Sequence, residues 1–121
     1  MNTYLRTGAL AVALLSLAAL TGCASQPKTL YHWAGYEEQV YEHFKNEKGP
    51  QEQIAALEAS LQQARARARD VTPAPGFHAH LGMLYAEVGK GDQVRQQFET
   101  EKTLFPESAP YMDFLMRNFE K

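Results

Sequence analysis

The sequence predicts an all-α fold, and three observations predict it. After Thr29, apolar residues recur every three or four positions, which is the spacing of amphipathic helices. No segment there alternates apolar and polar residues over the length of a strand. Glycine and proline divide the periodic segments at 49–50, 71–76, 89–91 and 106. We therefore expect about five helices, arranged as antiparallel hairpins in one small domain.

The first residues are typical of a secretory signal. Arg6 precedes an apolar run from Ala9 to Leu20, which matches the charged and hydrophobic regions of a signal peptide. The alternative, a membrane span, needs about 20 apolar residues, and this run is shorter. The segment Leu20-Thr21-Gly22-Cys23 that ends the run resembles the lipobox of bacterial lipoproteins at all four positions. This resemblance implies cleavage before Cys23, diacylglycerol on its thiol and usually an acyl chain such as palmitate on the new amino terminus.

Cys23 is the only cysteine of the chain, and its alternative role is that of a small buried side chain. Its place after a signal-like run favours lipid attachment. Residues 1–22 are then a lipoprotein signal peptide, residues 23–29 a lipidated tether and residues 30–121 the helical domain. At about 3.5 Å per residue the tether reaches about 20 Å. Ala24 follows the cysteine instead of Asp, which in similar lipoproteins favours the outer membrane, so we expect a lipid-anchored, periplasm-facing protein.

The first two helices are expected on either side of the Gly49-Pro50 pair. Residues Tyr36, Val40 and Phe44 recur on one face and predict a helix that packs with that face, with Tyr41 beside it. A second helix is expected from Pro50 to Arg69. Its apolar stripe consists of Ile54, Leu57, Leu61, Ala64 and Ala68.

Three further helices are expected after the proline-rich break at 71–76, which a helix cannot cross. The third runs from Phe77 to Val88 and the fourth from Asp92 to Phe105, with a glycine-rich turn between them. A last helix is expected at 111–119, where Ser108 offers an N-cap and Pro110 a first-turn proline.

The third and fourth helices carry a motif that resembles the tetratricopeptide repeat. The matching residues are Leu81, Gly82, Tyr85, Gly89, Phe98 and Pro106. The residues that depart from the pattern are His78, Val94 and Glu101, which stand where it prefers Trp, Ala and a small residue. Gly82 would let the paired helices approach closely, while Phe98 packs back from the second helix. A generic helical hairpin is the alternative, and no register aligns residues 31–69 with the motif.

Three segments resemble a family of small proteobacterial outer-membrane lipoproteins of unknown function with tetratricopeptide-like helices. They are residues 30–36, 75–82 and 101–108. Members are often encoded beside a curli-channel-like lipoprotein and a second small lipoprotein. The resemblance implies a role in an envelope assembly, with a curli-channel-like lipoprotein as a possible partner, and it supplies no catalytic residues.

The charged and ligating residues do not form a recognisable chemical site. The formal net charge of −2 gives no footprint for nucleic acid, and we expect no cofactor. His78 and His80 point to different sides of a helix, so we expect no metal site, and His32 and His43 are expected to be solvated. The adjacent acids at 37–38 suit a helix start.

Arg65, Arg67 and Arg69 lie at the carboxyl end of their helix, where cations are favoured by the helix dipole. The alternative is that they meet lipid phosphates or an acidic partner near the membrane. An aromatic cluster of Tyr31, Trp33 and Tyr36 lies between tether and first helix and suits contact with a partner. Packing of these rings over the open end of the helical stack is equally compatible with the sequence.

These observations predict a lipid-anchored helical adaptor of an outer-membrane assembly, which acts by protein–protein interaction and is not an enzyme. One alternative is a structural envelope lipoprotein without a single partner. A less favoured alternative is an envelope-polymer hydrolase with His78, His80 or Glu87 as acid or base.

Overall fold

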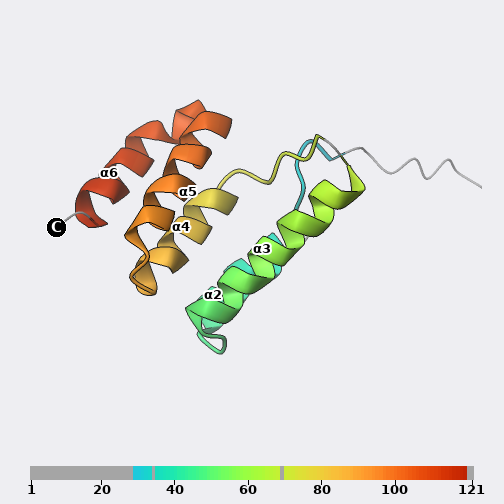
Figure 1. The fold of residues 1–121 in the computed structure, drawn as a ribbon, viewed down its shortest axis with the longest axis horizontal. Coiled ribbons are helices and arrows are strands. Elements are labelled where there is room, and N and C mark those ends of the chain that lie inside the picture. The colour runs from blue at the N-terminus through green and yellow to red at the C-terminus, as the bar shows by residue number, and fades with distance from the viewer. Residues whose placement is uncertain (1–28, 34, 69, 120–121) are drawn as a thin grey trace, which may run out of the picture.

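A computed structural model describes residues 29–33, 35–68 and 70–119, and within these ranges the protein is all-helical (Figure 1). The helices are α2 (Tyr36–Lys45), α3 (Pro50–Arg67), α4 (Phe77–Glu87), α5 (Gly91–Leu104) and α6 (Ala109–Phe119), with a 3-10 turn η1 (Pro106–Ser108) before α6. The predicted fold class is confirmed. The predicted signal peptide, Cys23 and all but the last residue of the predicted tether lie outside the described residues.

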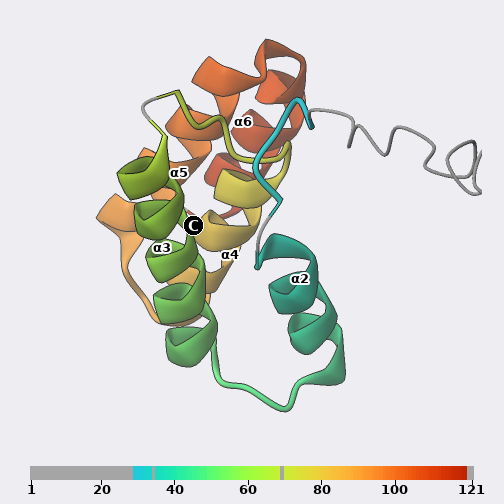
Figure 2. The ribbon, with the colours of Figure 1, turned by 90° about the vertical axis from the view of Figure 1, so that its right-hand side faces the viewer.

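The helices stack in the order of the chain. Helices α2 and α3 form one antiparallel hairpin, and α4 and α5 form a second one (Figures 1 and 2). Helix α4 also packs on α3, and α6 packs on α5. In the part of the chain that is described, no helix is long and apolar enough to cross a membrane.

The core lies between the two hairpins and extends to α6. Its fully buried side chains include Leu57 of α3, Leu84 of α4 and Phe98 of α5. A Cβ atom added to Gly82 would lie 2.5 Å from Cε1 of Phe98, so only glycine allows this approach of α4 to α5. The close approach expected at Gly82 is therefore confirmed.

The amino terminus of α4 is held by a side chain of α5. The carboxylate of Glu101, which is 2% exposed, accepts hydrogen bonds from the backbone N–H groups of Gly76, His78 and Ala79 at 2.6, 3.1 and 3.3 Å. The first N–H groups of a helix have no partner within the helix and need such an acceptor. Glu101 thus ties the two helices of the second hairpin together.

Positions in the first hairpin correspond to positions in the second hairpin at a constant separation along the chain, although the residue types do not reveal it. Pairs of residues with this separation are Gly35 and Gly76, Leu57 and Phe98, and Ser60 and Glu101. Gly35 and Gly76 precede α2 and α4 with φ of 79° and 91°, and Leu57 and Phe98 are both fully buried. Ser60 lies 3.2 Å from the Cβ position of Gly35, at the place where Glu101 meets Gly76. Positions correspond here although their chemical types differ.

The predicted packing face of α2 is wrong at one end. Phe44 is 81% exposed and Tyr41 is 63% exposed, whereas Gln39 is buried. Each step of four residues turns a helix by about 40° beyond a full turn, so Phe44 drifts about 80° away from Tyr36. The contact face is centred on Tyr36 and His43, and His43 is half-buried instead of solvated.

The start of α6 also differs from the prediction. The helix begins at Ala109, directly after the 3-10 turn. The hydroxyl of Ser108 donates a hydrogen bond of 2.7 Å back to the carbonyl of Phe105 instead of accepting one from the helix start. Ser108 therefore closes the turn that precedes α6.

Candidate interaction surfaces

The leading segment, residues 29–33, is attached to the linker between the hairpins. The His32 N–H donates to the Thr72 carbonyl at 2.8 Å, and the Ala74 N–H donates to the His32 carbonyl at 3.2 Å. These bonds form an isolated parallel bridge between His32 and Pro73. The leading segment therefore has a fixed place on the domain.

The three aromatic residues predicted as a partner contact take different places. Tyr31 packs edge-on against Phe105, with ring centroids 5.6 Å apart. Tyr36 packs against Phe77 at 5.7 Å, and burial followed by the charge of Glu101 raises its pKa. Trp33 stacks on Tyr36 at 6.3 Å and keeps 42% of its surface exposed. The structure thus brings Trp33 and Tyr36 together, and of the three rings Trp33 is the most open to solvent.

Four large apolar side chains of the leading segment and α2 are exposed, and we call them the N-terminal apolar set. They are Leu30 at 85%, Trp33 at 42%, Tyr41 at 63% and Phe44 at 81%. The Lys45 Nζ atom lies 5.4 Å from the centre of the Tyr41 ring. Exposed groups of large apolar side chains mark interaction sites more often than isolated ones do.

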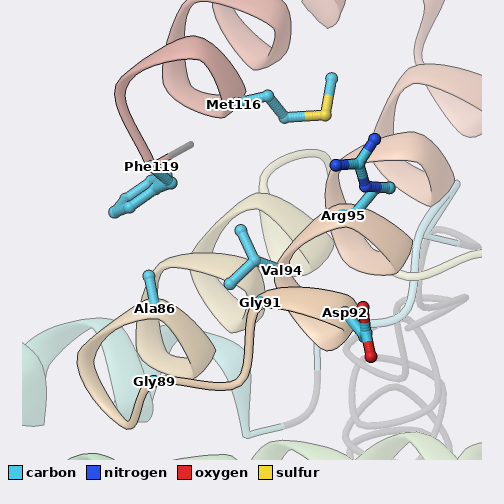
Figure 3. Close-up of a pocket in the computed structure, with 8 residues that line it drawn as sticks. All are labelled: Ala86, Gly89, Gly91, Asp92, Val94, Arg95, Met116 and Phe119. Atoms are coloured by element: carbon cyan, nitrogen blue, oxygen red, sulfur yellow. The ribbon is translucent and has the colours of Figure 1, made fainter. Parts of the chain in front are cut away.

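A groove of about 360 Å³ lies between the α4–α5 turn and α6 (Figure 3). Its apolar lining comprises Ala86, Val94, Met116 and Phe119, and its charged lining comprises Asp92 and Arg95. Gly89 and Gly91 line it along the turn (Figure 3). Its volume lies at the lower end of the range for ligand sites, so it has room for a small ligand or a partner side chain.

Helix α6 presents a second exposed aromatic pair. The rings of Tyr111 and Phe114 stack with centroids 6.4 Å apart and an interplanar angle of 16°. They are 57% and 51% exposed. Sequence reasoning missed this pair, although the helical spacing places both residues away from the buried Met112.

The three residues considered as the acid or base of a hydrolase lie in three different parts of the domain. His78 Nδ1 is hydrogen-bonded to Gln97 Oε1 of α5 at 2.6 Å, and burial lowers its pKa. The His80 ring lies 5.2 Å from that of His43 on α2, and burial lowers the pKa of His80 to about 4. Glu87 is exposed at the end of α4. The divergence of His78 and His80 was expected from their spacing.

Arg65, near the end of α3, lies beside a polar groove. Arg65 and Arg67 are in the last turn of α3, as predicted, and Arg69 lies outside the described residues. Arg65 lines a groove of about 300 Å³ between α3 and α5, together with His78 and Gln97. No group of three His, Cys, Asp or Glu side chains among the described residues could hold a metal ion.

Comparisons with known proteins place the chain in a family. No curated protein and no solved structure matches it. A family model described as a domain of unknown function, DUF4810, matches residues 30–115. The match runs from the leading segment through both hairpins into α6. The chain therefore belongs to the family defined by the domain of unknown function DUF4810.

Proposed function

We propose that this protein is a lipid-anchored helical adaptor of an outer-membrane assembly, which acts by binding another envelope protein. The lipobox-like segment that ends at Cys23 supports the anchor, and the tether would hold the domain within about 20 Å of the bilayer. Two or more acyl chains keep a protein on a membrane essentially permanently. The adaptor would therefore meet its partner at the membrane surface.

The observation that carries the adaptor role is the exposure of the N-terminal apolar set. Leu30 and Trp33 follow the proposed tether directly, on a segment that backbone hydrogen bonds fix to the domain, while Tyr41 and Phe44 lie on α2. Aromatic side chains on a fixed backbone are efficient contacts, because binding orders few rotatable bonds. The Trp33 ring stacks on the Tyr36 ring, so the exposed face of Trp33 is already positioned for a partner.

The proposed hairpin type is that of tetratricopeptide repeats. The contact of Gly82 with Phe98 supports this hairpin type. The register of α6 supports it too, because Met112 follows His78, and Leu115 follows Leu81, by the same number of residues, which is the length of one repeat. Such repeats serve as binding scaffolds. The family resemblance makes a curli-channel-like lipoprotein the first partner to test.

Crosslinking in cells tests the adaptor role. We expect the full-length protein to crosslink to one specific envelope protein, and the double variant Trp33→Ala/Phe44→Ala to lower that yield about tenfold. The matched control is Tyr111→Ala/Phe114→Ala, which removes the other exposed aromatic pair and should leave the yield unchanged. Recovery of monomer alone from the parent protein would exclude the adaptor role.

The anchor has its own test. Cys23→Ser should abolish incorporation of labelled lipid and release the domain from the membrane fraction. Labelling that persists in this variant would refute the lipoprotein proposal. The alternative of a structural lipoprotein predicts association with peptidoglycan and no specific crosslink, and the hydrolase alternative predicts loss of function on alanine substitution of His78, His80 or Glu87.

A further inference from the structure

Helix α6 has two opposite faces. Met112 is buried and Met116 is half-buried against the core. At about 100° per residue, Tyr111, Phe114 and Asn118 fall on the other side of the helix, and all three are exposed. The outer face of α6 is thus an aromatic strip one helix wide.

Two exposed, oppositely charged residues flank this strip along the chain. Glu107 lies in the turn before α6 and Arg117 lies in its last turn, and both are exposed. Neither forms an ion pair within the described residues, whereas the neighbouring Asp113 binds Lys102 at 2.7 Å. Among the described residues, an acid without an ion pair thus precedes the strip and a base without an ion pair lies near its carboxyl end.

The aromatic pair and the charge pair share a midpoint. The positions halfway between Tyr111 and Phe114, and halfway between Glu107 and Arg117, both fall at residues 112–113. A twofold axis through that point places Tyr111 against Phe114 of a second copy and Glu107 against Arg117 of a second copy. Such an interface is self-complementary, as the symmetry of an isologous dimer requires.

We infer that the outer face of α6 binds the same face of a second copy of this chain, with the two helices antiparallel. An unrelated partner would need its own matching charges, whereas a second copy supplies both of them with the correct spacing. The contact is one helix wide and therefore weak in solution. Confinement of both copies to one membrane raises their effective concentration and favours pairing. This last point rests on the proposed anchor.

Two differently tagged full-length copies, expressed together in membranes and crosslinked before solubilisation, test the inference. We expect co-purification that falls at least tenfold in Tyr111→Ser/Phe114→Ser. The matched control Tyr41→Ser/Phe44→Ser, which removes the exposed pair of α2, should keep it. Thermal unfolding of each variant checks that the domain still folds, since both pairs are exposed.

Charge reversal tests the antiparallel arrangement. Arg117→Glu alone and Glu107→Arg alone should each reduce co-purification about tenfold, because each brings like charges together. The double variant Glu107→Arg/Arg117→Glu should restore it. Co-purification that is unchanged in Tyr111→Ser/Phe114→Ser, or a double reversal that fails to restore pairing, would overturn the inference. Crosslinks to an envelope partner through the N-terminal apolar set are measured separately, so either proposal can fail while the other stands.

Discussion

Glu101 caps the start of α4, and this role was not recognisable from the sequence. In the tetratricopeptide-like pattern it is a departure, because a small residue is preferred there. The structure explains the departure, because the Glu101 carboxylate accepts hydrogen bonds from three N–H groups at the start of α4. Local capping patterns are recognisable over three or four residues, whereas this cap comes from another helix. Gly82 was easier to predict because its role depends on size alone.

Removal of this carboxylate should weaken the fold. We expect Glu101→Gln to lower the free energy of unfolding by about 1 kcal/mol, because a neutral amide is a weaker acceptor. Glu101→Ala should cost about 2 to 3 kcal/mol, because it leaves buried N–H groups without an acceptor. Urea denaturation measures both values. Glu87→Gln, on the exposed end of α4, should stay within about 0.5 kcal/mol of the parent. Equal values for Glu101→Ala and Glu87→Gln would contradict the capping role.

At the scale of helices, periodicity and punctuation predicted the starts of α3 and α4, whereas α3 ends at Arg67 before the expected Arg69 and α6 starts two residues early. Pro50 and Phe77 are the predicted first residues of α3 and α4, and Gly89 separates α4 from α5. The rotation of α2 was not predictable, because its contact face is set by Phe77 and His80 of α4. Spacing within a helix shows which residues share a face but does not show how far the neighbouring helix covers it.

The α4–α5 turn offers a paired test of backbone conformation. A Cβ atom at Gly89 or at Gly91 meets no atom within 4 Å, so neither substitution is limited by space. Gly91 opens α5 without a positive φ, and Gly91→Ala should stabilise the protein by about 0.5 to 1 kcal/mol. Gly89 has φ of 73°, and Gly89→Ala should destabilise it by about 1 kcal/mol. Thermal unfolding distinguishes them, and shifts of the same sign would contradict this assignment.

At the scale of the whole molecule, the stack joins α2 to the rest through polar and aromatic groups. His80 of α4 lies against Tyr36 and His43 of α2, and Gln39 is buried in α2. The sequence indicated the number and order of helices, but the register between hairpins and the place of the leading segment depend on contacts between distant residues. The exposure of Tyr111 and Phe114 was missed although helical spacing alone places both residues away from the buried Met112.

Stability should therefore depend on pH. Burial lowers the pKa of His80 from 6.5 to about 4, so the unfolded chain binds the proton more tightly than the fold does. This contribution is complete above about pH 6.5 and is lost as the pH falls toward 4. We expect the free energy of unfolding to fall by about 2 to 3 kcal/mol over this range. The free energy of unfolding of the variant His78→Gln/His80→Gln, measured by urea denaturation at each pH, should depend less on pH. An unchanged pH dependence would contradict the role assigned to His80.

The bridge between His32 and the linker also determines how the domain takes up mechanical load. A pull on the chain ahead of Thr29 acts on the contact of Tyr31 with Phe105 and then on the hydrogen bonds of His32 to Thr72 and Ala74, which lie between the hairpins. A pulling force is thus transmitted to the linker between the hairpins, and it does not act on α2 until the bridge breaks. Because the paired segments run parallel, a pull along them loads both bonds together in shear. The bridge therefore keeps a force on the preceding chain from acting on the surface of α2.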